Sequence, residues 1–187
     1  MKIFTVATLL FLSVCCFAQA PKATIYSPNT DLYVGYLVTY PDYGLNFNSY
    51  QFNGAEVAFT KSLRSHLSIT AAGDFSTGTV YNTKQFSGTI GPKVNLLTGR
   101  FRPYITVQGG FAYQTSNGMY AFDHHPPLVP GTTDTESGFT YRYGGGADFQ
   151  LTRKVYWRVL QWDIQPQPWA RHTPWYQNAG SGLGYVF

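Results

Sequence analysis

The sequence predicts an all-β protein, an eight-stranded antiparallel up-and-down transmembrane β-barrel. Apolar residues recur at every second position in eight segments of about ten residues, the pattern of strands with one apolar and one polar face. The connections between these segments are alternately short and long. Aromatic residues make up 18% of the chain and charged residues 12%, yet no stretch after residue 20 approaches the ~20 apolar residues of a membrane helix.

Residues 1–20 are predicted to be a secretory signal peptide. A lysine precedes the apolar run of residues 3–17, and small residues follow it. Cleavage fits after Ala18 or after Ala20, and residues 21–187 form the predicted barrel domain. Both cysteines lie in the signal segment, so the exported chain is expected to have no disulfide and no thiolate metal site.

The first four expected strands cover residues 32–40, 54–60, 66–75 and 85–96. Each has large apolar residues on one face and small or polar residues on the other. The apolar faces consist, in order, of Leu32, Val34, Tyr36, Val38 and Tyr40; Ala55, Val57 and Phe59; Leu67, Ile69, Ala71 and Phe75; and Phe86, Ile90, Val94 and Leu96.

The last four expected strands cover residues 104–113, 138–150, 155–164 and 180–187. Three of them alternate cleanly, with apolar faces formed by Ile105, Val107, Phe111 and Tyr113; Phe139, Tyr141, Tyr143, Ala147 and Phe149; and Leu183, Tyr185 and Phe187. The seventh strand loses its phase between Arg158 and Gln161. This break predicts a β-bulge, although it leaves the register of that strand open.

The connections predict the orientation of the barrel. Short turns at residues 61–65, 97–100 and 151–154 alternate with longer connections, as in outer-membrane barrels with short periplasmic turns and long outer loops. The short turns and their flanks hold the cations Lys61, Arg64, Arg100, Arg102, Arg153 and Lys154. These cations are expected to meet lipid head groups, although a hydrophilic turn needs no such partner.

A soluble eight-stranded barrel is the alternative fold, because its strands alternate too. The less apolar face here carries many Gly, Ala, Ser and Thr residues, which suit a narrow interior. The other face carries Tyr, Phe, Trp, Leu and Val, which are too bulky for a lumen that eight strands barely open. Aromatic residues near strand ends also match the girdles of membrane barrels.

The chain resembles the small eight-stranded outer-membrane barrels of the kind that forms the transmembrane domain of outer membrane protein A. The resemblance lies in "GPKVNL", "RFRPYITVQGGFAY", "YRYGGGADFQLTRKVYWRVLQWD" and the last strand. It implies a location in the cell outer membrane, contact with outer-membrane lipids and insertion by the barrel-assembly machinery. Gly182, Tyr185 and Phe187 match the assembly signal of such proteins, whereas Gly180 stands where a polar residue is usual.

The polar faces carry six charges that are expected to meet inside the barrel: Glu56, Asp74, Lys93, Arg142, Asp148 and Arg158. A lone charge in a narrow lumen is costly, so these residues are expected to form ion pairs. The resemblance likewise implies an interior salt-bridge network. The network is interpreted as a plug, with a gate or narrow ion path as the alternative.

The long connections hold the candidate contacts for an extracellular ligand, which the sequence does not identify. His124 and His125 point opposite ways on an extended chain and have no fixed third ligand, so no metal is predicted. Trp169 and Trp175 lie in a proline-rich connection and are candidates for a recognition surface.

The predicted function is structural or surface interaction by a barrel with a closed lumen. A narrow pore for ions or small solutes is the alternative, and a lipid-modifying enzyme is the third. His66 lies near Ser65 and Ser68, but no nucleophile motif surrounds it, so no catalytic residue and no cofactor are predicted. The net charge of +4 is too small and too scattered to indicate nucleic-acid binding.

Overall fold

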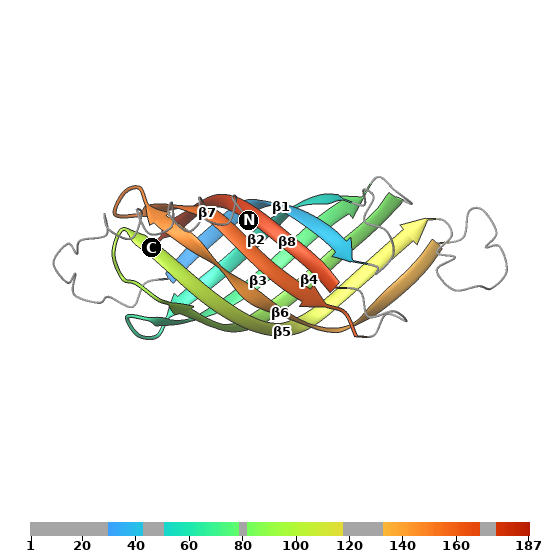
Figure 1. The fold of residues 1–187 in the computed structure, drawn as a ribbon, viewed down its shortest axis with the longest axis horizontal. Coiled ribbons are helices and arrows are strands. Elements are labelled where there is room, and N and C mark those ends of the chain that lie inside the picture. Colours follow the sequence, from blue (N-terminus) through green and yellow to red (C-terminus); the bar gives the residue numbers. More distant parts are fainter. Residues whose placement is uncertain (1–29, 43–50, 79–81, 118–132, 169–174) are drawn as a thin grey trace, which may run out of the picture.

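The computed structural model describes residues 30–42, 51–78, 82–117, 133–168 and 175–187, which form a closed antiparallel barrel of eight strands (Figure 1). No helix in these segments is long and apolar enough to cross a membrane. The strands are β1 (Thr30–Asp42), β2 (Phe52–Ser62), β3 (Leu67–Gly78), β4 (Thr83–Asn95), β5 (Phe101–Asn117), β6 (Thr133–Gln150), β7 (Val155–Pro166) and β8 (Trp175–Val186).

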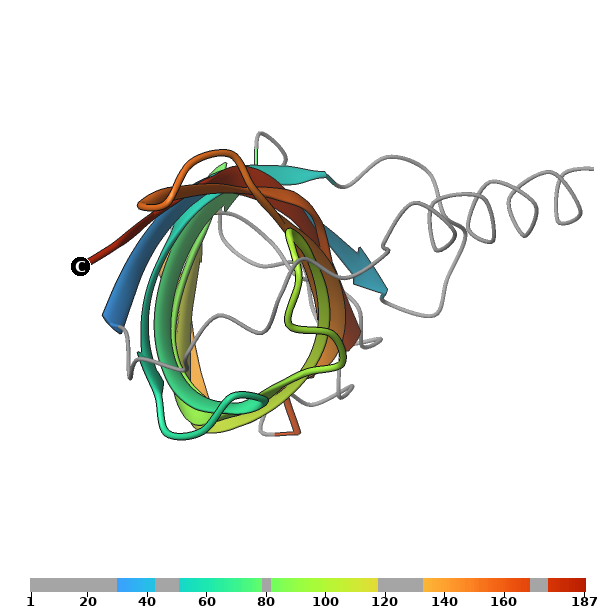
Figure 2. The same ribbon diagram turned by 90° about the vertical axis from the view of Figure 1, so that its left-hand side faces the viewer.

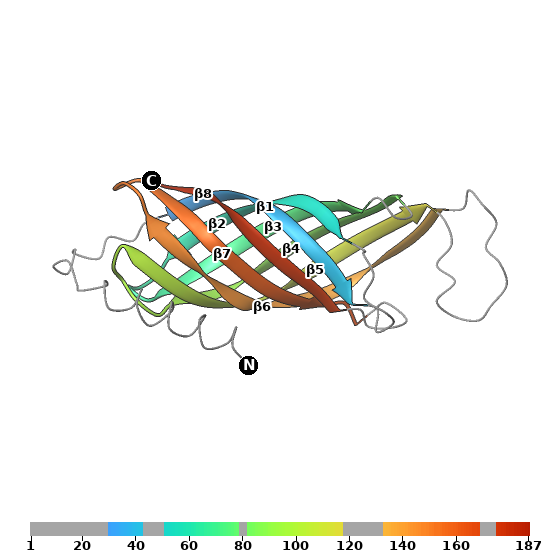
Figure 3. The same ribbon diagram turned by 45° about the horizontal axis from the view of Figure 1, so that its top comes forward.

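Each strand pairs with the next in the chain, and β8 pairs with β1 to close the ring, as the end-on view in Figure 2 shows. The closing pair runs from Asp31 opposite Val186 to Asp42 opposite Trp175. Figure 3 shows β1 and β8 side by side along this seam. Closure leaves no free sheet edge along the wall, so the backbone groups there are satisfied without water. The predicted fold class is therefore confirmed.

The side chains alternate between an apolar outer wall and a polar interior. Val34, Ile90 and Val107 are among many large apolar residues exposed on the wall, whereas Thr70, Ser87 and Thr140 are buried inside. A soluble barrel would bury its apolar face, so this arrangement contradicts the soluble alternative.

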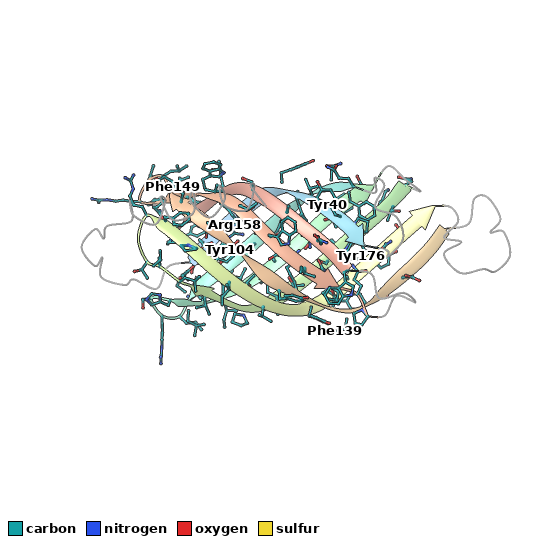
Figure 4. The ribbon with its side chains drawn as sticks, viewed as in Figure 1. Tyr40, Tyr104, Phe139, Phe149, Arg158 and Tyr176 are labelled. Carbon is teal, nitrogen blue, oxygen red and sulfur yellow. The ribbon has the colours of Figure 1, made fainter. Side chains whose placement is uncertain are left out.

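Aromatic side chains gather toward the two ends of the outer wall, as expected for residues at membrane interfaces. Phe149, Trp157 and Tyr185 are exposed at the end that carries the short turns, and Tyr40 and Phe139 are exposed toward the other end. Figure 4 shows Phe149 at one end of the barrel and Tyr40 and Phe139 near the opposite end.

Three strands extend at one end by four or more residues beyond the range that the apolar alternation predicts. β5 continues past residue 113 to Asn117, β6 begins at Thr133 rather than 138, and β8 begins at Trp175 rather than 180. Trp175 is therefore a strand residue, not the loop residue that the sequence suggested. The alternation ends earlier than the strands because backbone pairing, such as Gln114 with Glu136, continues where polar side chains remain.

The predicted bulge in the seventh strand is confirmed. The register of β7 against β8 shifts between Arg158 and Gln161, and its register against β6 shifts opposite Ala147 and Asp148. Val159 and Leu160 are consequently both exposed on the outer wall. The bulge inserts one extra residue between Arg158 and Gln161, and the alternation of inward and outward side chains then continues. Both Arg158 and Gln161 therefore point into the lumen.

Candidate functional site

The six charged residues predicted for the interior all lie buried in the lumen and form ion pairs with one another. Arg142 on β6 donates to Glu56 on β2 at 3.0 Å and also bonds Asp74 on β3. Because β6 and β2 stand four strands apart in an eight-stranded ring, Arg142 reaches across the barrel. These pairs join opposite walls of the lumen.

A second group of pairs surrounds Asp148. Its two carboxylate oxygens accept from Arg158 Nε at 2.9 Å and from Lys93 Nζ at 2.8 Å. Arg158 Nη1 also lies 3.7 Å from Glu56 Oε1, which connects this group to the first. The interior charges therefore form one continuous network.

Gln161 holds the centre of the network together. Its amide nitrogen donates to Glu56 at 2.9 Å and to Asp163 at 2.6 Å. Its amide oxygen accepts from Arg158 at 2.8 Å and from Tyr104 at 3.3 Å. One neutral side chain thus bonds two carboxylates and one guanidinium, which ties β2, β5 and β7 together.

Sequence reasoning missed Gln161 and Asp163, which lie beyond the bulge. Asp163 is fully buried, so the network contains four carboxylates and three cations. One of its oxygens accepts from Gln161, and the other has no hydrogen-bond partner among the described residues. Continuing the alternation after one inserted residue would have placed both side chains inside.

Large aromatic rings also fill the lumen, contrary to the expectation that they would all face outward. Tyr33, Tyr104 and Tyr156 are buried there. Arg158 stacks over Tyr33 with its guanidinium carbon 3.9 Å from the ring centre, and Lys93 Nζ lies 4.0 Å from the centre of Tyr104. Figure 4 shows Arg158 and Tyr104 together in the half of the barrel nearer the short turns.

Inward-facing glycines make room for these rings. A Cβ on Gly146 would lie 2.7 Å from the Tyr104 hydroxyl, and a Cβ on Gly184 would overlap the ring of Tyr156. Gly146 is paired directly with Tyr104, and Gly184 directly with Tyr156. The sequence shows the many glycines of this face, but only the register shows which ring each one accommodates.

Little space remains inside the network. The cavity bounded by Glu56, Lys93, Arg142, Arg158 and Asp163 has a volume of about 10 Å³. That volume corresponds to roughly one water molecule. At the level of the network, the described side chains therefore leave little space in the lumen.

The other predicted site residues do not form one common site. Tyr185 and Phe187 are exposed on the outer wall with ring centres 5.3 Å apart, and Gly182 faces inward opposite Gly35. Trp175 is exposed at the first position of β8, near the end opposite the short turns. The remaining candidates, His124, His125 and Trp169, lie outside the described residues.

The structure does not assemble a hydrolase site around His66. Its Nδ1 lies 2.8 Å from the backbone oxygen of Asn95, and the ring is exposed at a turn. Ser68 is buried inside the barrel, where it donates to Ser62 at 3.4 Å. Within the described segments, no group of three His, Cys, Asp or Glu residues is arranged to hold a metal ion.

A closed eight-stranded ring with an apolar wall and a charge-paired interior defines a small transmembrane β-barrel. The chain belongs to the family described as outer membrane protein beta-barrel domain, whose model matches residues 7–187. Membership of this family places the protein in the outer membrane. No curated protein matches the sequence.

Solved structures with the same fold include three bacterial surface or outer-membrane proteins. Neisserial surface protein A has a TM-score of 0.67 at 8% identity, covering 84% of this chain and 97% of that chain. Ail, the attachment invasion locus protein of Yersinia pestis, has a TM-score of 0.57 at 12% identity, covering 87% and 100%. OprG from Pseudomonas aeruginosa has a TM-score of 0.52 at 12% identity, covering 86% and 96%. At such identities the likeness concerns the fold.

Proposed function

We propose that this protein is a non-conducting outer-membrane barrel whose ion-paired network acts as a plug, and that its role is structural or surface interaction. The observation that carries the proposal is the span of Arg142 across the lumen to Glu56 and Asp74. A side chain that pairs with the opposite wall obstructs the lumen and fixes the distance between the walls.

The energetics favour a permanent plug. An ion that passes through the network must displace pairs that are desolvated and hydrogen-bonded on both sides, because Gln161 and Ser87 also bond the carboxylates. Separating one buried partner from the other costs about 3–5 kcal/mol, which leaves little population of an open state. A larger barrel would hold such charges on a hydrated wall instead.

If the lumen is closed, the activity of the protein is expected to reside on the outer surface of the barrel. The name of one structural neighbour, attachment invasion locus protein, fits a surface role for that protein. For this chain the support comes from the rigid plugged wall, which presents the outer connections as recognition loops do on other rigid scaffolds. Catalysis has no support from His66, and we propose that the protein is not an enzyme.

The proposal also assigns an assembly signal to the last strand and an export signal to the N-terminus. Tyr185 and Phe187 lie on the lipid-facing side of the strand that closes the barrel, a position suited to recognition by the assembly machinery before closure. Residues 1–20 are proposed as the export signal, and they lie outside the described residues.

Single-channel recording of the refolded protein in a planar bilayer tests the proposal. We expect no steady openings from the unaltered protein. Arg142→Ala, which removes the residue that spans the lumen, is expected to produce openings, whereas Lys61→Ala on the outer wall is expected to remain silent. Correct folding of each variant is checked by its heat-dependent mobility in detergent gels.

One result would make a pore the better description. That result is steady openings of the unaltered protein whose conductance changes in Arg158→Ala or Glu56→Ala and not in Lys61→Ala. The interior charges would then line a path for ions, and the plug proposal would be wrong.

A further inference from the structure

Cations and aromatic rings gather on the outer wall of β5–β8, at the end that carries the short turns. We call this surface the rim patch. Its members share exposure on the wall or at the adjoining turn, and they are Arg100, Phe149, Arg153, Lys154, Trp157 and Tyr185.

Strand register places the three rings of the rim patch in a row. Phe149 on β6 is paired with Trp157 on β7, and Tyr185 on β8 is paired with Val155, two residues before Trp157. Figure 4 shows Phe149 at this end of the barrel. Rings in such a row mark the level at which the hydrocarbon core meets the head groups.

Two of the cations lie directly over these rings. The guanidinium carbon of Arg100 is 5.9 Å from the centre of Phe149, and Lys154 Nζ is 5.8 Å from the centre of Tyr185. Arg153 and Lys154 lie in the turn that joins β6 to β7. This turn stands between Phe149 on β6 and Tyr185 on β8, the two rings that the cations cover. The cations are therefore held just beyond the aromatic row, at the depth of lipid phosphates.

The cations of the rim patch form no close ion pair with the described acidic side chains. Arg100, Arg153 and Lys154 take part in none of the ion pairs within 4.0 Å that the described residues form in the lumen. Asp31, which lies at this end of β1, accepts from the inward-facing Tyr156 at 2.7 Å. The charged side chains of the patch itself are all cations.

We propose that the rim patch binds the phosphate groups of anionic phospholipids in the leaflet that meets the short turns. Three cations above a row of rings fit a head group with excess negative charge, while the rings contact the glycerol and the upper acyl chains. The opposite end does not offer the same surface, because its described strand ends contain more acids than cations: Asp42, Lys84, Asp134 and Glu136. The inference assumes an inserted barrel and does not depend on a closed lumen.

Fluorescence quenching by brominated lipids tests the inference, because Trp157 lies within the patch. The test protein carries Trp162→Phe, Trp169→Phe and Trp175→Phe, so that Trp157 alone reports. It is refolded into phosphatidylcholine vesicles that contain a minor fraction of brominated phosphatidylglycerol or, separately, of brominated phosphatidylcholine. Brominated phosphatidylglycerol is expected to quench more strongly at equal mole fraction, which gives a relative binding constant above one.

Charge variants then distinguish lipid binding at the rim patch from a general electrostatic attraction between the protein and anionic lipid. Arg100→Gln combined with Lys154→Gln is expected to lower the relative binding constant about fivefold for each cation removed. Lys61→Gln combined with Arg64→Gln removes the same charge at the turn between β2 and β3, on the opposite side of the ring, and is expected to leave the constant unchanged. If the first double variant folds poorly, Lys154→Gln alone carries the comparison.

Two kinds of result would overturn the inference. Equal quenching by the two brominated lipids, or equal losses in the two double variants, would show that the rim patch does not select anionic lipid. Co-sedimentation with purified peptidoglycan that is lost in the Arg100 and Lys154 variant, with unchanged lipid quenching, would assign the patch to the cell wall instead.

Discussion

Arg142→Met removes a side chain that pairs with two carboxylates across the lumen. Arg142 is fully buried, and both Glu56 and Asp74 are almost fully buried. After the substitution Asp74 keeps the bond from Ser87 at 2.8 Å but loses its close cation. Glu56 keeps the bond from Gln161 and retains only Arg158, at 3.7 Å, as a cation partner. Removal of one partner from a buried ion pair costs about 3–5 kcal/mol, so we expect a loss of that size.

Reversible urea unfolding in lipid vesicles, followed by tryptophan fluorescence, measures this loss. Lys61→Met is the control, because Lys61 is exposed on the outer wall, and it is expected to change stability by no more than about 0.5 kcal/mol. Adding Glu56→Gln and Asp74→Asn to Arg142→Met removes the uncompensated charges and is expected to recover most of the loss. A loss below about 1 kcal/mol for Arg142→Met, or no recovery in the triple variant, would show that Arg142 does not compensate the buried charges of Glu56 and Asp74.

Three further predictions use the same unfolding assay. Gly184→Ala places a Cβ in the ring of Tyr156 and is expected to lower the free energy of unfolding by about 1–3 kcal/mol. Gly88→Ala, where nothing lies within 4 Å of the new Cβ, is expected to be nearly neutral, and equal losses of stability in the two variants would contradict the steric explanation. Tyr156→Phe removes the 2.7 Å bond to Asp31 and is expected to cost about 1 kcal/mol, so an unchanged midpoint would count against that bond. Val107→Lys on the exposed wall is expected to cost about 2–4 kcal/mol and Leu97→Lys at a short turn less than about 1, and the reverse order would mean that the wall does not face lipid.

The fold follows from the sequence because a strand in lipid must alternate. Val57 and Phe59 face outward, whereas their neighbours in sequence, Glu56 and Thr60, face inward. The alternation of apolar and polar residues therefore assigns both faces of the strand. The ends of β5, β6 and β8 are less predictable, since beyond the membrane backbone pairing proceeds without any apolar pattern.

The sequence predicts which charged residues face the lumen but not which of them form ion pairs with one another. Alternation places Arg142 and Glu56 inside, yet their contact depends on barrel closure and strand stagger, which bring β6 opposite β2. Asp163 was missed because one inserted residue reverses the phase of everything after it. The buried tyrosines were missed because each one requires a glycine on a neighbouring position, and that match appears only once the register is known.

The geometry of the rim cations could not be predicted from the sequence. Their sequence positions in short turns predict exposure, but the stacking of Arg100 on Phe149 and of Lys154 on Tyr185 depends on which strands are neighbours. Sequence therefore predicts the charge of this end, and structure adds the geometry that suggests a lipid site.

Thiol labelling inside the lumen tests the closed plug most directly. Thr70→Cys places a thiol in the wall of the central cavity, and Thr98→Cys places one on an exposed turn, in a chain expressed without residues 1–20, which hold both native cysteines. With a membrane-impermeant methanethiosulfonate reagent, we expect rapid labelling at position 98 and none at position 70 in the folded barrel. Comparable labelling rates at the two positions would contradict a lumen closed by its ion pairs.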